Sequence, residues 1–322
     1  MPKKRKTIGL ALGGGAARGL VHIGVLKVLH KHKIYPDYIA GTSMGAIIGA
    51  AYAANRSPDE LHEIASTVDW KKMVDFTVPK SGIIKGDAIE KGFQKLVKLK
   101  SFKELVIPLH VVAYNVTKKQ KVIFSKGDVA KALRASSSIP GIFSPALING
   151  NEYIDGVVVD PTPFDVVREM GADIIIAVDL YNKDKRGKAV APKKGSLMQE
   201  LREKFLIVEL LNLKNLLFPE RWPKLLRRFL QWIFDKVLYP AKVLRILAKK
   251  ELPPITRVMY DSFNIVVNSY AKERMKNGDI DIKLRPEFRN LRWADFDKVD
   301  QFVRLGEKTM EVQMRKLKRK LR

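Results

Sequence analysis

Residues 8–19, Ile-Gly-Leu-Ala-Leu-Gly-Gly-Gly-Ala-Ala-Arg-Gly, carry an apolar run that ends in a cluster of glycines and opens a helix-like segment. Residues 38–45, Tyr-Ile-Ala-Gly-Thr-Ser-Met-Gly, have the same organisation. A sharp turn from a strand into a helix favours glycine, because a β-carbon there would collide with the adjacent backbone. Two such units near the start of the chain predict a layered α/β fold with a mostly parallel central sheet flanked by helices.

The second unit contains the pattern Gly-x-Ser-x-Gly, formed by Gly41, Ser43 and Gly45. Between a strand and a helix this pattern is typical of a nucleophile elbow, and free N–H groups at a helix start favour negative charge. The five histidines are His22, His30, His32, His62 and His110. All of them precede the best later acid, Asp155, so the chain order Ser, Asp/Glu, His of the α/β-hydrolases is excluded. Asp155, before Gly156 and after the extended stretch 152–154, is therefore the candidate base of a Ser43–Asp155 dyad.

Six segments in this order resemble the patatin-like phospholipases, in particular the bacterial branch related to the catalytic domain of neuropathy target esterase. They are Gly9–Gly19, His22–Leu26, Gly41–Gly45, Ala135–Pro140, Tyr153–Gly156 and Asp160–Pro163. The resemblance covers roughly the first 180 residues, just over half of the chain. It implies a serine acyl hydrolase that acts on lipid esters through a Ser–Asp dyad.

The chemistry assigns a role to each of these groups. Ser43 is the candidate nucleophile and needs a base within hydrogen-bond reach. Asp155 can act as that base if burial raises its pKa. Backbone N–H groups of Gly14, Gly15 and Ala16 are candidate oxyanion donors, and Arg18 either steadies their loop or attracts a phosphate headgroup. The remaining motif glycines are Gly13, Gly19, Gly41, Gly45 and Gly156.

Two residues depart from the pattern usual in relatives: Ala16 replaces a glycine, and Val157 stands where Gly or Ala follows the dyad Asp-Gly. Both add bulk beside the site and bear on substrate fit. Three alternatives compete with the enzyme interpretation. The glycine cluster could be a dinucleotide loop, although neither frame completes Gly-x-Gly-x-x-Gly. Ser43 could be an ordinary helix N-cap, and Asp155 could be a turn residue.

Composition bounds the partners. The 322 residues include no cysteine, which is compatible with a reducing cytoplasm. No paired His, Cys or acidic residues lie at ligand spacing, so we expect neither a metal nor a cofactor. The net charge of +26 favours an anionic membrane surface, and no motif supports nucleic acid as a partner beyond this charge. We expect a cytoplasmic, peripherally membrane-associated enzyme with a lipid ester substrate. The alternative is a catalytically degenerate protein that binds membranes or nucleic acid through its basic surface.

Three regions are expected: a catalytic core over 1–182, a basic amphipathic helical insertion over 183–254, and C-terminal helices with a basic tail over 255–322 that complete the core. The basic start at 1–6 precedes an apolar run broken by glycines, so no signal peptide is expected. The insertion contains apolar helical patterns at 197–218, 222–239 and 241–250, of which 222–250 could lie in a membrane interface. Oligomeric state, headgroup and acyl-chain preference stay open.

Overall fold

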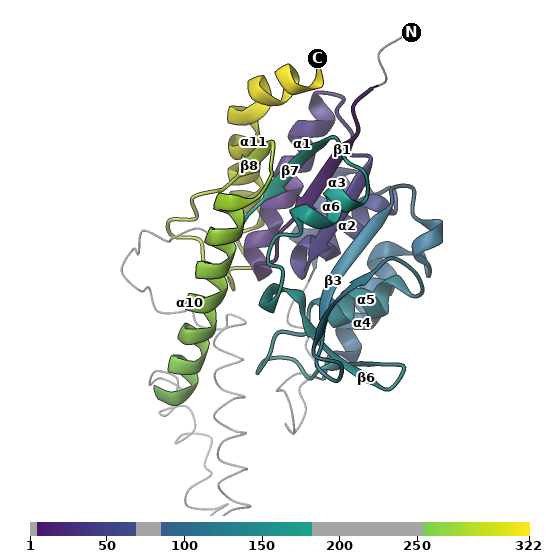
Figure 1. Ribbon diagram of the computed structural model, residues 1–322, viewed down its shortest axis with the longest axis vertical. Coiled ribbons are helices and arrows are strands. Elements are labelled where there is room, and N and C mark those ends of the chain that lie inside the picture. Colours follow the sequence, from purple (N-terminus) through teal and green to yellow (C-terminus); the bar gives the residue numbers. More distant parts are fainter. Residues whose placement is uncertain (1–4, 69–84, 182–253) are drawn as a thin grey trace, which may run out of the picture.

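The computed structural model describes residues 5–68, 85–181 and 254–322 (Figure 1). The strands are β1 (Ile8–Leu12), β2 (Tyr38–Thr42), β3 (Leu109–Asn115), β4 (Gln120–Phe124), β5 (Ala146–Ile148), β6 (Asn151–Asp155), β7 (Ile174–Val178) and β8 (Ile282–Leu284). The α-helices are α1 (Val21–Lys31), α2 (Met44–Ala53), α3 (Pro58–Thr67), α4 (Asp87–Val97), α5 (Val129–Ser136), α6 (Phe164–Glu169), α10 (Pro254–Asn277) and α11 (Val299–Leu321). Short 3-10 helices are η1 (Ala16–Leu20), η2 (Phe102–Glu104) and η3 (Gly156–Val158).

The strands form one eight-stranded sheet in the order β5-β6-β3-β2-β1-β7-β8, with β4 also paired to β3. Strands β1, β2, β3, β7 and β8 run parallel to their neighbours in this series. Strands β4, β5 and β6 pair in the antiparallel sense. The predicted mixed α/β fold with a mostly parallel central sheet is thus confirmed.

Strand β3 sets the position of the site. One of its edges pairs with β4, and its other edge is shared by two strands. Val112 lies opposite Thr42 at the end of β2, and the next residue, Ala113, lies opposite Asp155 at the end of β6. Because Ser43 follows Thr42 directly, this register brings Ser43 and Asp155 together although 112 positions separate them.

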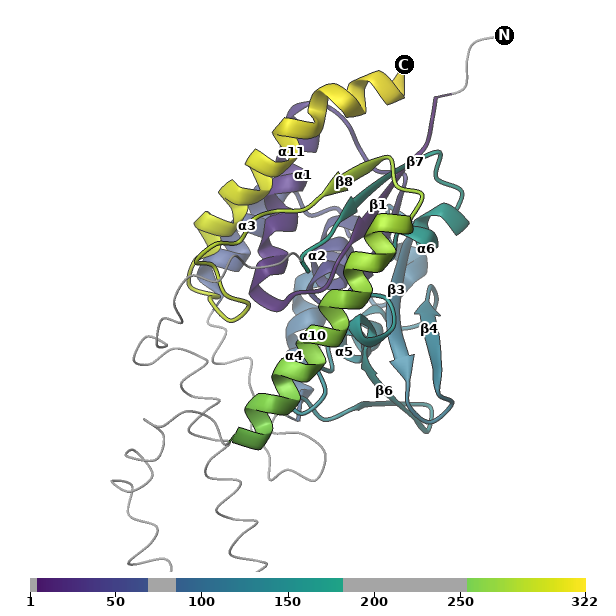
Figure 2. The ribbon, with the colours of Figure 1, turned by 60° about the vertical axis from the view of Figure 1, so that its left-hand side comes forward.

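Helices cover both faces of the sheet because alternate side chains of each strand point to opposite sides. On β1, Leu10 and Leu12 pack into a large core formed with α1, α2 and α11, whereas Ala11 faces a smaller core formed with α6 and α10. Figures 1 and 2 both show α11 alongside α1. The sheet is therefore buried on both faces, as expected for parallel strands.

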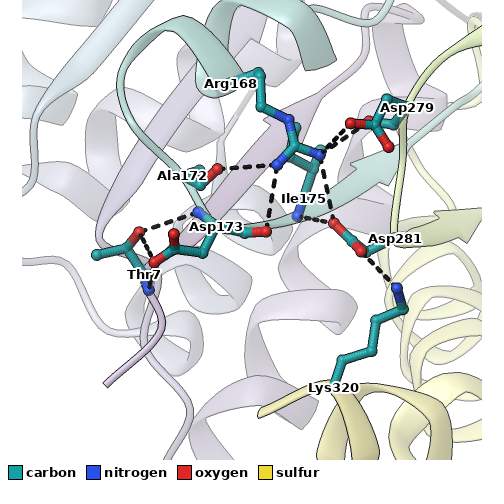
Figure 3. A network of polar contacts seen from close by, with 8 residues as sticks. All are labelled: Thr7, Arg168, Ala172, Asp173, Ile175, Asp279, Asp281 and Lys320. Atoms are coloured by element: carbon teal, nitrogen blue, oxygen red, sulfur yellow. Dashed lines mark hydrogen bonds and ion pairs between the residues drawn. The ribbon is translucent and has the colours of Figure 1, made fainter. Parts of the chain in front are cut away.

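A polar network ties the end of the chain to the edge of the sheet (Figure 3). Arg168 on α6 pairs with Asp279, 2.9 Å away. Asp281, just before β8, accepts from the backbone N–H of Ile175 at 2.9 Å and pairs with Lys320 of α11 at 2.6 Å. These contacts fix α11 relative to β7 and β8, so the C-terminal segment belongs to the same packed body.

Both units quoted from the sequence form as expected, the first as β1 followed by η1 and α1 and the second as β2 followed by α2, and Ser57 caps α3 with a full capping box. Three elements were not expected: α4, the short strand β5, and β8, which the sequence placed in a purely helical C-terminal region. β8 is only three residues long and pairs with β7, which is far away in the chain. The helical patterns at 197–218, 222–239 and 241–250 lie outside the described residues.

Candidate active site

Ser43 sits on a sharp turn between β2 and α2. Its backbone has φ 55° and ψ −125°, a conformation that L-residues rarely adopt. A β-carbon on Gly41 would lie 2.5 Å from the backbone of Ala46, and one on Gly45 would lie 2.1 Å from the carbonyl oxygen of Leu12. The glycines of Gly-x-Ser-x-Gly therefore permit the close contacts of a turn that holds Ser43 in a strained conformation.

The hydroxyl of Ser43 donates a hydrogen bond to Oδ2 of Asp155 at 2.7 Å. The other carboxylate oxygen, Oδ1, accepts from the backbone N–H of Val157 at 3.0 Å. Asp155 is fully buried, and burial raises its pKa to about 7 against the opposing effect of these two hydrogen bonds. A carboxylate with this pKa is a far better base near neutrality than an ordinary aspartate.

Two serines of the segment 135–140 hold the pair in place. The hydroxyl of Ser136 accepts from the Ser43 backbone N–H at 2.8 Å and donates to the carbonyl of Val112 at 2.6 Å. The carbonyl of Ser138 accepts from the Asp155 backbone N–H at 2.9 Å. The sequence marked this segment as a motif but assigned no role to either serine. In the structure, Ser136 bonds to the backbone of Ser43, and Ser138 bonds to the backbone of Asp155.

The glycine loop between β1 and η1 approaches the same site. Gly15 and Ala16 line the pocket beside Ser43, and in the described residues their backbone N–H groups donate to no backbone carbonyl. The N–H of Gly14 instead donates to the carbonyl of Pro161 at 3.0 Å. This bond removes Gly14 from the expected oxyanion donors, and its importance is steric: a β-carbon there would lie 2.4 Å from Val157 and 3.1 Å from the Ser43 β-carbon.

The backbone conformation at position 16 favours glycine, the residue usual there in relatives. Ala16 has φ 48°, in the left-handed region that costs a residue with a β-carbon of the order of 1 kcal/mol. The presence of Ala16 in place of glycine therefore puts backbone strain into the glycine loop itself. Val157, the other departure, is buried against Gly14, where its side chain fills the space left by the missing β-carbon.

His22 contacts this loop, and the side chain of Arg18 extends from it to a neighbouring ring. Nε2 of the fully buried His22 lies 2.8 Å from the Gly13 carbonyl oxygen, and because that oxygen can only accept, Nε2 carries the proton. Burial lowers the pKa of His22 to about 4, so the ring is neutral near pH 7. The guanidinium of Arg18 lies over the ring of Phe288, 4.8 Å from its centroid, and Arg18 lines the pocket.

The pocket itself is a small cavity of about 70 Å³ with Ser43 and Asp155 in its wall. Helix α10 contributes Phe263, Asn264 and Asn268, and the loop before α11 contributes Trp293. Ile139, Ile142, Val157 and Leu180 make much of the remaining lining apolar. The pocket combines an apolar wall with a serine–aspartate pair, which suits an ester with a hydrocarbon portion.

A buried ion cluster joins α10 to the segment that follows Asp155. Asp160 is fully buried and lies 2.7 Å from Nζ of Lys121 and 3.0 Å from the guanidinium of Arg274 on α10. Arg274 also pairs with Asp165 at 2.8 Å. The carbonyl of Asp160 accepts from the Thr42 hydroxyl at 2.8 Å. One residue thus connects the wall of the pocket with the strand that carries Ser43.

The competing interpretations of the motifs fare differently. Ser43 does occupy the N-cap position of α2, but its hydroxyl caps no backbone N–H and bonds to Asp155 instead. Asp155 begins η3 as well as accepting from Ser43, so the turn role and the pairing coexist. Within the described ranges, no cluster of His, Cys, Asp or Glu is suited to a metal ion, and no helix there is long and apolar enough to cross a membrane.

Sequence comparison identifies the family that the chain resembles. Residues 10–168 match a family model described as patatin-like phospholipase. An uncharacterized NTE family protein of Mycobacterium tuberculosis is 34% identical over 179 residues, 55% of this chain and 50% of that protein. Patatin-like phospholipase domain-containing protein 6 of Homo sapiens is 32% identical over 188 residues, and Lysophospholipase NTE1 of Candida albicans is 31% identical over 187 residues. Each of these two matches spans 14% of the relative. The resemblance inferred from the motifs is confirmed.

The fold has a counterpart among solved structures. The crystal structure of VipD from Legionella pneumophila superposes with a TM-score of 0.54 at 13% identity, over 98% of this chain and 67% of that chain. At this identity the likeness concerns the fold alone. The chain spans half or less of the length of the three sequence relatives, so their activities as whole proteins are not carried over.

Proposed function

The chain carries a patatin-like phospholipase domain, and we propose that this domain is a serine acyl hydrolase that cleaves carboxylic esters of phospholipids or lysophospholipids. The observation that carries the proposal is the 2.7 Å hydrogen bond from the Ser43 hydroxyl to Asp155, a fully buried carboxylate. The name of one relative, a lysophospholipase, supports the choice of substrate.

In the first step Oγ of Ser43 attacks the ester carbonyl carbon while its proton passes to Oδ2 of Asp155. The backbone N–H groups of Gly15 and Ala16 stabilise the oxyanion of the tetrahedral intermediate. Protonated Asp155 then returns the proton to the leaving alcohol oxygen as the C–O bond breaks. In the second half-reaction water attacks the acyl-serine and gives its proton to Asp155. Asp155 then returns this proton to Oγ of Ser43 as the bond between Oγ and the acyl carbon breaks and the fatty acid leaves.

The surroundings of Asp155 favour these proton transfers. Its pKa of about 7 makes both protonation states accessible near neutrality, as the two half-reactions require. The neutral His22 fixes the Gly13 carbonyl and so keeps the glycine loop in register with Ser43. Arg18, on the pocket wall, is placed to steady that loop or to meet a phosphate headgroup.

The test combines active-site labelling with hydrolysis. A fluorophosphonate probe should label the wild type at Ser43 and leave Ser43→Ala unlabelled, while Ser43→Ala and Asp155→Asn should each lose at least about a thousandfold in kcat for lysophosphatidylcholine. Ser137→Ala is the matched control, since the Ser137 hydroxyl, among the described residues, donates only to backbone carbonyls of the last turn of α5. Full activity of Ser43→Ala would refute the mechanism. A folded wild type that neither takes the probe nor cleaves any ester would favour a degenerate binding protein.

A further inference from the structure

An open groove of about 860 Å³ lies between α11 and the loop that precedes it. Its lining includes six Lys or Arg side chains and a single acid, Glu287. Three of the six are already engaged: Arg285 pairs with Asp179, Lys298 pairs with Asp295, and Lys283 donates to the Met275 carbonyl. The other three, Arg289, Arg304 and Lys308, are exposed and have no ion pair within the described residues.

Helix α11 extends this positive groove along the surface. Four basic residues of α11 follow one another at intervals of four, seven and four residues, which keeps them on one face of the helix, and all four are exposed: Arg304, Lys308, Arg315 and Arg319. Two of the three acids of α11 are engaged with other helices: Asp300 bonds to His62 of α3, and Glu311 pairs with Lys31 of α1. The four basic residues of this face have no ion pair within the described residues.

The surface also has an apolar component. Val312 lies between Lys308 and Arg315 in α11, beside the basic face, and is 72% exposed, and the half-buried Leu291 and Leu305 line the groove. A surface that joins cations with exposed aliphatic groups matches the boundary between phosphate headgroups and acyl chains. It matches a purely polar polyanion less well, because Val312 would gain nothing from such a partner.

The surface adjoins the pocket through a short stretch of chain. Phe288 lines the groove, and the guanidinium of Arg18, which lines the pocket, lies over its ring. Trp293, a few residues later, lines the pocket and accepts from the Ala17 N–H through its carbonyl at 2.8 Å. A bilayer that engages the groove would therefore lie beside the loop that borders the catalytic cavity.

From these observations we infer that the outer face of α11, with Arg289 and the adjacent groove, is a docking surface for anionic phospholipid headgroups at a membrane. The choice of a lipid surface rests on the proposed function. The surface lies in the described C-terminal part of the chain and consists of other residues than the segment 222–250, for which the sequence left open whether it lies in a membrane interface. It supplies the contact through which the enzyme meets a bilayer substrate.

The experiment uses full-length protein carrying Ser43→Ala, so that binding is measured without hydrolysis. Sedimentation with mixed phosphatidylcholine–phosphatidylglycerol vesicles should show binding that falls at least about tenfold in Arg304→Glu/Lys308→Glu, since each basic contact near such a surface contributes about 1 kcal/mol. The matched control is Lys91→Glu/Lys95→Glu, which makes the same charge change at the same spacing on the exposed face of α4. Vesicles of phosphatidylcholine alone should bind weakly throughout.

Equal loss in the two charge-reversal variants would mean that only net charge matters and would overturn the assignment, as would unchanged binding in Arg304→Glu/Lys308→Glu. Selective loss of RNA binding, with vesicle binding unaffected, would replace the lipid by a nucleic acid. If the glutamate variant does not fold, Arg304→Gln/Lys308→Gln gives the same comparison. When Ser43 is retained, Arg304→Glu/Lys308→Glu should cleave a small soluble ester at a rate within twofold of the wild type. If the wild type cleaves no such ester, the proposed function is refuted, whereas the vesicle-binding result still stands.

Discussion

The guanidinium of Arg274 lies 3.0 Å from the carboxylate of Asp160, which is fully buried. This contact crosses from α10, which lines the pocket beside Ser43, to the segment that leads away from Asp155. Asp160 also holds Thr42, the residue before Ser43, through its carbonyl. The position of the wall is thereby coupled to the position of the candidate nucleophile.

Arg274→Met should destabilise the protein by about 3 kcal/mol, because it leaves a buried carboxylate with Lys121 as its remaining cation. Chemical denaturation measures this change. Lys276→Met, an exposed substitution on the same helix, is the control and should change the unfolding free energy by less than about 0.5 kcal/mol. If the ion pair with Asp160 causes the loss, Arg274→Met should lower the unfolding free energy much less in a protein that carries Asp160→Asn. Fully additive effects of the two substitutions would contradict an energetic coupling between Arg274 and Asp160.

Ester hydrolysis should depend on pH with a single inflection near 7. Only the deprotonated form of Asp155 can accept the Ser43 proton, and burial raises its pKa to about 7, so kcat/KM should rise with pH below that value and level off above it. The pKa of His22 is lowered to about 4 and places its titration outside this range. Burial also raises the pKa of Asp160, to about 6; Asp160→Asn should keep the inflection near 7. A profile that moves with Asp160→Asn would assign the inflection to Asp160.

Ser136→Ala should lower kcat by about ten- to a hundredfold with little change in KM. The substitution leaves the Ser43 N–H and the Val112 carbonyl without their shared hydroxyl, so the turn at Ser43 loses its support while the pocket keeps its lining. Kinetics on a soluble fluorogenic ester measure the effect. Ser136→Thr, which retains a hydroxyl, should recover part of the activity, whereas a loss confined to KM would place Ser136 in substrate binding instead.

Gly14→Ala should inactivate the enzyme by steric means, because its new β-carbon would lie 2.4 Å from a methyl group of Val157. Val157→Ala removes that methyl group, so the double variant Gly14→Ala/Val157→Ala should regain at least tenfold in kcat/KM over Gly14→Ala. The remaining 3.1 Å contact with the Ser43 β-carbon should keep it below wild type. If the second substitution brings no recovery, the crowding at Val157 is not the cause of the loss.

The first 180 residues were predictable because their signals are local. Apolar runs such as 8–12 are bounded by glycines, and Ser57 with Glu60 forms a capping box that marks the start of α3. Ser43 could be predicted from its glycines, and Asp155 from the absence of any later histidine. The contact between them rests on strand register, which the sequence does not state.

Other features depend on neighbours that are remote in the chain. Strand β8 forms because β7 offers it an edge, and its three residues carry too little pattern to be recognised alone. The loss of Gly14 as an oxyanion donor depends on Pro161, almost 150 positions later. The roles of Ser136 and of Arg274 likewise arise from partners brought close only by the packed sheet.

The shared edge of β3 has a consequence for how the protein acquires activity. Because Val112 takes β2 as its neighbour and Ala113 takes β6, a shift of β6 by one residue would turn the Asp155 side chain to the opposite face. Ser43 and Asp155 are thus brought together only when β2 and β6 both pair in register with the same edge of β3. If Ser43 and Asp155 form the proposed dyad, ester hydrolysis in a refolding experiment should therefore appear only after β2 and β6 have both paired with β3, and its rate of appearance would report on that pairing.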